Sequence, residues 1–158
     1  MTGSSGMILA VVILLVFSSL FSAIETAFSC ASKIRLKNMA SDGDSRATEV
    51  LHILENYDRL LTTVLIGNNI VNISAATVST ILFTDLIGSA NGPTVSTVVL
   101  TVLTLMFGEI APKSVAKQCP EKFSCATVGF MKFFLAVLSP LSWLAGGWTY
   151  IVNHVIKI

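Results

Sequence analysis

The sequence has few charged residues: Asp, Glu, Lys and Arg make up only 12% of its 158 positions, whereas 53% are hydrophobic. A water-soluble domain of this size carries charged side chains at about a quarter of its positions, so the composition excludes an ordinary soluble fold. The formal net charge of +1 leaves no clustered basic excess for a phosphate-binding surface. We therefore expect an all-α integral membrane protein in a lipid bilayer that binds no nucleic acid.

The sequence also lacks the usual motifs of metal and catalytic sites. Its three cysteines, Cys30, Cys119 and Cys125, form no CxxC pair and lie in or beside apolar stretches, so we interpret them as small hydrophobic residues. There is no GxSxG, HExxH or P-loop motif, and the two histidines are isolated. We therefore do not expect an enzyme.

Three long apolar runs are expected to cross the membrane. Residues 7–31 would extend about 37 Å as a helix, enough to cross a hydrocarbon core of about 30 Å. The runs at 60–87 and 94–116 flank the turn GSANGP, which predicts a helical hairpin. The first six residues, MTGSSG, are small and polar, and we expect them to be disordered or left over from cloning.

The segment between the first two runs, residues 33–58, is rich in charge and is expected to form short helices in water. Its apolar residues recur at intervals near three and four, which predicts an amphipathic helix after a turn at 42–44. Basic residues in short loops stay in the cytoplasm. Residues 33–59 hold five basic residues and the turn at 88–93 holds none. We therefore expect a multi-pass plasma-membrane protein with its N-terminus outside and its C-terminus in the cytoplasm.

The last segment, residues 123–156, allows two interpretations. Its hydropathy favours a fourth span. Lys132, Pro140 and the Gly146-Gly147 pair interrupt it, and Trp143, Trp148 and Tyr150 cluster as aromatic residues do at membrane interfaces. These features favour a bent amphipathic helix in the interface, and the residue pattern alone leaves both open.

All three predicted spans contain polar side chains at comparable depth. Counting from the nearest basic residues, Glu25 lies roughly 12 Å into its span, the asparagines of residues 68–72 about 13–20 Å, and Glu109 roughly 6–12 Å. A carboxylate at such depth costs on the order of 3 kcal/mol and needs a partner, a cavity or an ion.

These side chains form a ligand set of oxygens. Asn68 and Asn72 are four apart and share a helix face, whereas Asn69 is turned by about 100°. With Ser22 and Glu109 they supply amide, hydroxyl and carboxylate oxygens, which suit a hard cation such as Mg²⁺ or Na⁺. Pro112 leaves the carbonyl of Gly108 without its usual amide donor, and a freed carbonyl can also be a ligand.

Other readings of the same residues stay open. Intramembrane serines and asparagines commonly join helices through hydrogen bonds, and the small residues of the second span are typical of a helix interface. These small residues are Ser74, Ala75, Ala76, Ser79 and Thr80. A Na⁺ or proton pathway in which Glu109 titrates is a further alternative.

With these residues assembled, the sequence resembles the transmembrane domain of the cyclin M/CorC family of magnesium transporters. The strings that carry the resemblance are FSAIETA (21–27), SKIRLKNMA (32–40), LLTTVLIGNNIVN (60–72), FGEIAPKSVA (107–116) and LSPLSWL (138–144). The resemblance implies three transmembrane helices, a belt-like juxtamembrane helix that ends in the cytoplasm, and a homodimer formed through the second and third spans.

The resemblance also implies a function and a set of ligands. It implies a Mg²⁺ transporter that exports Mg²⁺ in exchange for Na⁺ by alternating access. The metal ligands carried over by motif are Ser22, Asn68, Asn72 and Glu109 with main-chain carbonyls, and Glu25 matches a further family position. Cytoplasmic CBS domains usually follow this domain in the family and are absent from these 158 residues. The alternative expectation is a membrane anchor and dimerisation platform for such domains, without ion transport of its own.

Overall fold

The computed structural model describes residues 2–157, and these are helical almost throughout. The described part of the chain contains no strand. The helices are α1 (Thr2–Cys30), α2 (Lys33–Ser41), α3 (Ser45–Leu54), α4 (Tyr57–Ile87), α5 (Gly92–Leu103), the π-helix η1 (Thr104–Ile110), α6 (Ala111–Gln118), α7 (Pro120–Val137) and α8 (Ser139–Ile156).

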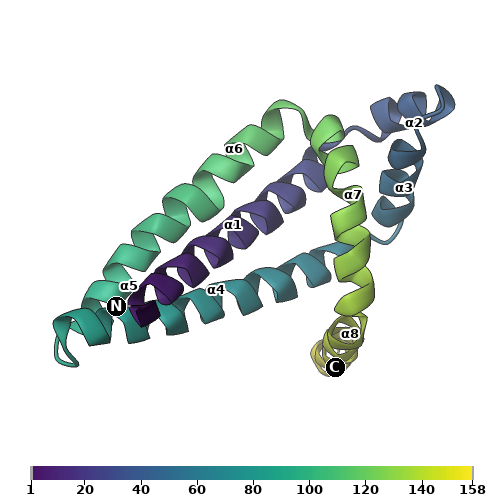
Figure 1. The fold of residues 1–158 in the computed structure, drawn as a ribbon. Coiled ribbons are helices and arrows are strands. Elements are labelled where there is room, and N and C mark those ends of the chain that lie inside the picture. Colours follow the sequence, from purple (N-terminus) through teal and green to yellow (C-terminus); the bar gives the residue numbers. More distant parts are fainter. Residues whose placement is uncertain (1, 158) are drawn as a thin grey trace.

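Three helical segments are long and apolar enough to span a membrane, which confirms the predicted three-span architecture. They are Gly3–Cys30, Tyr57–Ile87 and the continuous run Gly92–Gln118, which joins α5, η1 and α6. Figure 1 shows α4 and α5 meeting at one end of the bundle and diverging toward the other, with α1 lying between α4 and α6. Helix α1 therefore contacts both other spans.

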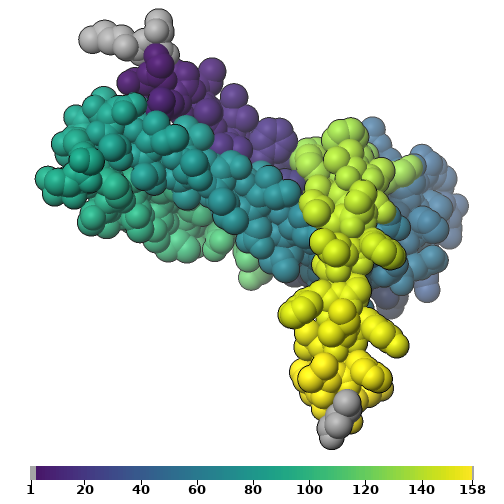
Figure 2. Space-filling view, turned by 90° about the horizontal axis from the view of Figure 1, so that it is seen from below, coloured from purple at the N-terminus to yellow at the C-terminus, as the bar shows by residue number. Residues whose placement is uncertain are grey.

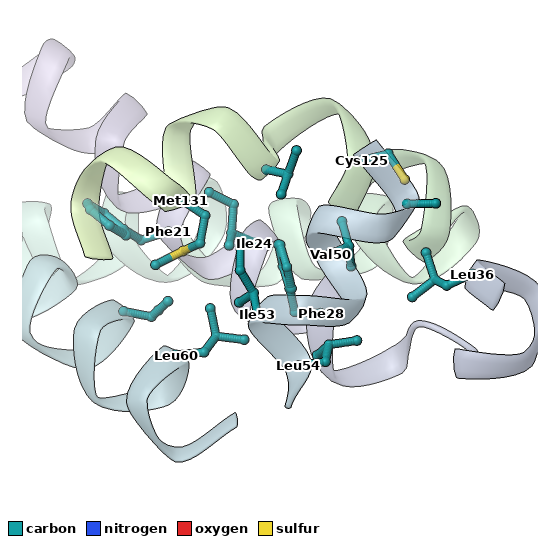
Figure 3. Packing of buried hydrophobic residues seen from close by; sticks show 13 residues of the cluster. Phe21, Ile24, Phe28, Leu36, Val50, Ile53, Leu54, Leu60, Cys125 and Met131 are labelled. Carbon is teal, nitrogen blue, oxygen red and sulfur yellow. The ribbon is translucent and has the colours of Figure 1, made fainter. Parts of the chain in front are cut away.

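Helices α2, α3 and α7 gather at the end of the bundle where the spans diverge (Figure 1), which we call the α2–α3 end. Their core includes Phe21 and Phe28 from α1, Leu36 from α2, Val50 from α3 and Met131 from α7 (Figure 3). The buried face of α3 matches the amphipathic pattern of its sequence. This core fixes the position of α1 against the two short helices and α7.

The start of each short helix is fixed by a capping side chain. The Ser32 hydroxyl accepts a hydrogen bond from the Arg35 amide, and the Asp44 carboxylate accepts from the amides of Arg46 and Ala47. Gly43 adopts a φ of 99° in the turn between them, a conformation that glycine tolerates without steric cost. The predicted turn at 42–44 therefore lies where the sequence places it.

Two expected boundaries differ from the structure. Residues 2–6 continue helix α1 instead of forming a disordered segment, and Met1 lies outside the described residues. The bent helix expected at 123–156 is indeed bent, but it begins earlier, at Pro120, and is divided at Leu138 into α7 and α8, which meet at 68°. Pro140 explains the break, because it has no amide to continue the helical bonding and disfavours helical geometry in the residue before it.

Gly67 marks the closest approach of α4 to α1. A Cβ at this position would lie 2.6 Å from Cζ of Phe21, whose ring is buried and packs against Phe130 and Phe134. We expect Gly67→Ala to destabilise the fold by about 1–3 kcal/mol, because the ring has no free space into which to move. Thermal unfolding in detergent would measure the loss. Gly129→Ala is the matched control, since a Cβ there meets nothing within 4 Å; equal melting temperatures for the two variants would contradict the packing.

The three cysteines, which we expected to be small hydrophobic residues, are all free thiols, and Cys125 is the buried one. Cys30 and Cys119 are exposed. Burial is the largest of the effects that raise the pKa of the Cys125 thiol. A thiol with a raised pKa stays protonated at neutral pH, and only the thiolate reacts readily. We expect a maleimide at neutral pH to label Cys30 and Cys119 in the folded protein and to leave Cys125 unmodified until denaturant is added. Mass spectrometry of the labelled peptides would check this, and labelling of all three thiols at similar rates would contradict it.

Candidate functional site

Helix α1 presents a polar face to the other spans through Ser18, Ser22 and Glu25, which are spaced by four and three residues and so share a face. Ser18 and Ser22 are fully buried. The Ser18 hydroxyl donates to the Asn68 side-chain oxygen on α4 over 3.2 Å. Ser22 was the expected ligand on this face; Ser18 was not expected, although its spacing of one turn from Ser22 was a signal that could have identified it.

The three asparagines of α4 differ in exposure. Asn68 and Asn72 are half-buried, whereas Asn69 is exposed. Asn68 joins α4 to α1 through Ser18. Asn72, one turn away, lines a groove of about 270 Å³ between α4 and the third span, together with Ser96 and Thr104. The two amides therefore lie where α4 approaches the other two spans.

The third span widens into the π-helix η1 beside Ser18. The amide of Ala111 donates to the Met106 carbonyl five residues earlier, and Pro112 has no amide to donate to either Phe107 or Gly108. Gly108 is buried, and a Cβ at this position would lie 3.1 Å from the Ser18 hydroxyl oxygen. The Ser18 hydroxyl thus lies between the side chain of Asn68 and the backbone of Gly108, in contact with both other spans.

Three polar side chains in this region have no protein partner among the described residues. Asn72, Glu109 and the carboxylate of Glu25 are half-buried, and none forms a hydrogen bond or ion pair with a described residue. Unpaired polar groups inside a membrane are unfavourable, so such groups mark a cavity or a ligand site. Glu109 follows Gly108 directly, which places its carboxylate in the widened turn.

Among the described residues, Asn68 is the expected ligand that hydrogen-bonds to another span, and its donor is Ser18, which was not in the expected set. Ser18, Asn68 and Gly108 are in contact across three spans, whereas no hydrogen bond joins Ser22, Asn72 or Glu109 to one another. The described residues contain no cluster of three or more His, Cys, Asp or Glu that could hold a metal ion. A cation here would therefore depend on one or two carboxylates supplemented by amide, hydroxyl and main-chain oxygens.

The small residues of the second span divide between two roles. Ser79 is buried and its hydroxyl lies 2.7 Å from that of Ser96, so it joins α4 to α5 within the chain. Ala75 is buried in a small cluster with Val11 and Leu100. Ala76 is exposed and faces the groove between α4 and α5. Only part of this stripe is available to a second molecule.

Comparison with known proteins matches nearly the whole chain to one family. Residues 9–158 match the family described as the cyclin M transmembrane N-terminal domain. An inner membrane protein of Escherichia coli K12, UPF0053 inner membrane protein YfjD, is 36% identical over 141 residues, which cover 89% of this chain and 33% of the relative. A UPF0053 protein of Haemophilus influenzae is 35% identical over 154 residues, 98% of this chain and 36% of the relative.

A second kind of relative carries a functional name. A protein of Haemophilus influenzae named polyamine export protein is 34% identical over 148 residues, which cover 86% of this chain and 34% of the relative. The chain thus spans about a third of the length of the relatives it matches.

Proposed function

The chain belongs to the family of cyclin M transmembrane N-terminal domains, and from this premise we propose that it binds Mg²⁺ between its three spans and carries it across the membrane. It is a multi-pass membrane protein of a family that includes export proteins. The finer assignment to Mg²⁺ is our proposal. It rests on polar side chains of three helices, which we call the polar layer: Ser18, Ser22 and Glu25 of α1, Asn68 and Asn72 of α4, and Glu109 of η1.

The observation that carries the proposal is the pair of half-buried, unpartnered groups next in the chain to a part-buried polar contact. Glu109 and Asn72 have no partner among the described residues; Asn72 lies one turn from Asn68, which hydrogen-bonds to Ser18, and Glu109 follows Gly108, which approaches Ser18 closely. Mg²⁺ prefers six oxygen ligands at about 2.0–2.1 Å. Amide, hydroxyl and carboxylate oxygens of this layer supply the right chemistry, with Ser22, Asn68, Asn72 and Glu109 as ligands and the carbonyl of Gly108 as a further candidate.

Glu25 supplies the second negative charge that a divalent ion at this site requires. One carboxylate leaves a divalent ion with a net positive charge in a medium of low dielectric, which is unfavourable. Glu25 shares the α1 face of Ser18 and Ser22 and is also half-buried without a partner among the described residues. We propose that it neutralises the ion or lines its exit path. Asn69 is exposed, so we assign it to the pathway and not to the site.

Export would proceed by alternating access, with Na⁺ entry as the driving force and one Mg²⁺ site in each subunit of a homodimer. The widened turn at η1 favours this mechanism, because π-helical segments are often found at functional sites and can shift register. The relatives are about three times as long as the region they share with this chain, and we propose that cytoplasmic CBS domains regulate the step in this family.

Flux measurements test the proposal. The purified protein would be reconstituted in liposomes loaded with a Mg²⁺-sensitive dye, and a Na⁺ gradient of either sign would be applied. We expect Mg²⁺ to move against the direction of Na⁺ flow and to stop when the gradient is removed. Mg²⁺ flux equal to that of empty liposomes would contradict the proposal.

Polyamine export is the second candidate, because relatives of this chain carry that name. A polyamine is a flexible cation with several amines, and it needs carboxylates spaced along its length more than a compact oxygen cage. The same liposomes loaded with labelled spermidine separate the two. Spermidine efflux without Mg²⁺ flux would favour the second candidate, and Mg²⁺ flux without spermidine efflux the first.

A platform without transport is distinguished by binding alone. Calorimetry of the purified protein with Mg²⁺ should give saturable heat if the polar layer is an ion site. A membrane anchor whose polar residues only join helices should give none.

The orientation of the chain is a separate proposal with its own test. We propose that the α2–α3 end lies in the cytoplasm, because residues 33–59 hold five basic residues and basic residues of short loops stay on that side. In a cysteine-free background we expect Ser89→Cys to react with an impermeant maleimide in intact cells and Ser41→Cys to react only after permeabilisation. Both positions are exposed in the structure, so the opposite labelling pattern would reverse the orientation.

A further inference from the structure

A polar cavity of about 800 Å³ opens between the first turn of α4 and the first turns of α8. Asp58 and Arg59 line it from α4, and Ser139, Ser142 and Trp143 line it from α8. The Arg59 guanidinium donates to the Ser139 hydroxyl over 3.4 Å, and the Ser142 hydroxyl lies 3.1 Å from that of Thr63. These contacts hold the two helix starts together and keep the cavity, which we call the headgroup pocket, in a defined shape.

The headgroup pocket presents one positive and one negative side chain. Asp58 and Arg59 are both exposed, and neither forms an ion pair with another described residue. Both charges are therefore available to a ligand. A ligand that carries only a negative or only a positive charge would place that charge near one unfavourable side chain, whereas a ligand with both signs would satisfy the two together.

The pocket lies where a bilayer places its lipid headgroups. Asp58 and Arg59 precede Leu60, where the apolar run of the second span begins. Trp143 is 82% exposed beside the pocket, as is typical of an aromatic residue at a membrane interface. Neither helix start has a side-chain cap, so the first amides of α4 have no side-chain acceptor that would compete with a phosphate.

An apolar groove continues from the pocket along α8. The groove has a volume of about 710 Å³ and is lined by Trp143, Leu144, Gly146, Gly147, Trp148 and Ile151. Trp143 and Gly146 also line the headgroup pocket, so the two cavities adjoin. In Figure 2, α8 projects away from the bundle, and no residue of this helix is buried. The polar pocket is followed by the apolar groove, just as the headgroup of a phospholipid is followed by its acyl chains.

We propose that the two cavities together bind one phosphatidylethanolamine molecule from the bilayer. Its phosphate accepts from Arg59 and the Ser139 hydroxyl, its primary ammonium donates to the Asp58 carboxylate, and an acyl chain lies along Trp143 and Trp148. Phosphatidylglycerol has the phosphate but no ammonium for Asp58. Phosphatidylcholine has a methylated ammonium that cannot donate a hydrogen bond.

Native mass spectrometry of the detergent-purified protein tests the assignment. The parent would be offered equimolar phosphatidylethanolamine, phosphatidylglycerol and phosphatidylcholine, and the retained lipid counted. We expect preferential retention of phosphatidylethanolamine. Arg59→Gln should lower that retention about five-fold, as for loss of a partly exposed charged contact, and Arg59→Lys should restore part of it. Arg46→Gln is the matched control, because Arg46 is an exposed arginine of α3 outside both cavities.

Two further comparisons separate this ligand from others. Asp58→Asn should remove the preference for phosphatidylethanolamine over phosphatidylcholine while leaving total lipid retention similar. An excess of soluble phosphoethanolamine, which has no chain for the groove, should leave the lipid in place. Equal retention of the three lipids by the parent, equal effects of Arg59→Gln and Arg46→Gln, or complete displacement by phosphoethanolamine would each overturn the proposal.

Discussion

Glu109→Gln should weaken Mg²⁺ binding by about 30- to 150-fold while leaving the fold intact. The substitution keeps the shape of the side chain and removes its charge, and a lost charged contact typically costs about 2–3 kcal/mol. Glu109 is half-buried and has no protein partner among the described residues, so the change breaks no contact that the fold requires. Calorimetry with Mg²⁺ would measure the loss, and thermal unfolding without Mg²⁺ should be unchanged.

Three variants make this result specific. Asp85→Asn removes a carboxylate of α4 that is exposed near the opposite end of the bundle, and it should bind Mg²⁺ like the parent. Asn72→Ala should weaken binding less than Glu109→Gln, because it removes a neutral ligand, and Asn69→Ala should have the least effect. If Glu109→Gln binds as tightly as the parent while Glu25→Gln abolishes binding, the site belongs to α1 and the ligand assignment is wrong.

Ala76→Trp should convert the proposed homodimer largely to monomer. Ala76 is exposed on α4 and lines the groove toward α5 with Asn72 and Thr80, and small residues let helices of two molecules approach closely in a membrane. An indole at this position would hold the surfaces apart and raise the dimer dissociation constant by more than about ten-fold. Light scattering in detergent would measure the mass of the protein.

The choice of position and control matters for this test. Ser79 belongs to the same small-residue stripe, but its hydroxyl contacts Ser96 inside the chain, so a Trp there would disturb the fold itself. Leu144→Trp introduces the same side chain on α8, where Leu144 is already exposed beside two tryptophans, and should leave the mass unchanged. A dimeric mass for both variants would place the interface away from α4.

The three spans were predictable because hydropathy and length depend on local sequence alone. The turn at 42–44 and the amphipathic α3 followed from the same kind of local pattern, namely a glycine in a positive-φ turn and apolar residues at helical spacing. The break at Leu138 was signalled by Pro140, and a bent helix was one of the two predicted forms, but the angle of the bend could not be predicted from local pattern. The bend of 68° depends on how α8 contacts Thr63 and Arg59 at the start of α4.

The candidate site was only partly predictable, because it depends on how helices rotate about their axes. Ser22 and Glu25 were predicted to belong to the site from their sequence motif, whereas Ser18 is the residue that forms the observed hydrogen bond to Asn68. The π-helix at 104–110 was also not expected, although Pro112 pointed to a freed carbonyl nearby. Its wider turn changes the direction of Glu109 relative to Gly108, which a regular helical count could not show.

The most direct test of a Mg²⁺ site in the polar layer is the position of a bound ion. Crystals grown with Mn²⁺, which shares the oxygen preference of Mg²⁺, would give an anomalous difference peak that locates the ion without assumptions about ligands. We expect one peak per subunit within coordination distance of the Glu109 carboxylate and the amide oxygens of α4. A peak bound only by surface carboxylates, or no peak between α1, α4 and η1 at saturating Mn²⁺, would contradict the account.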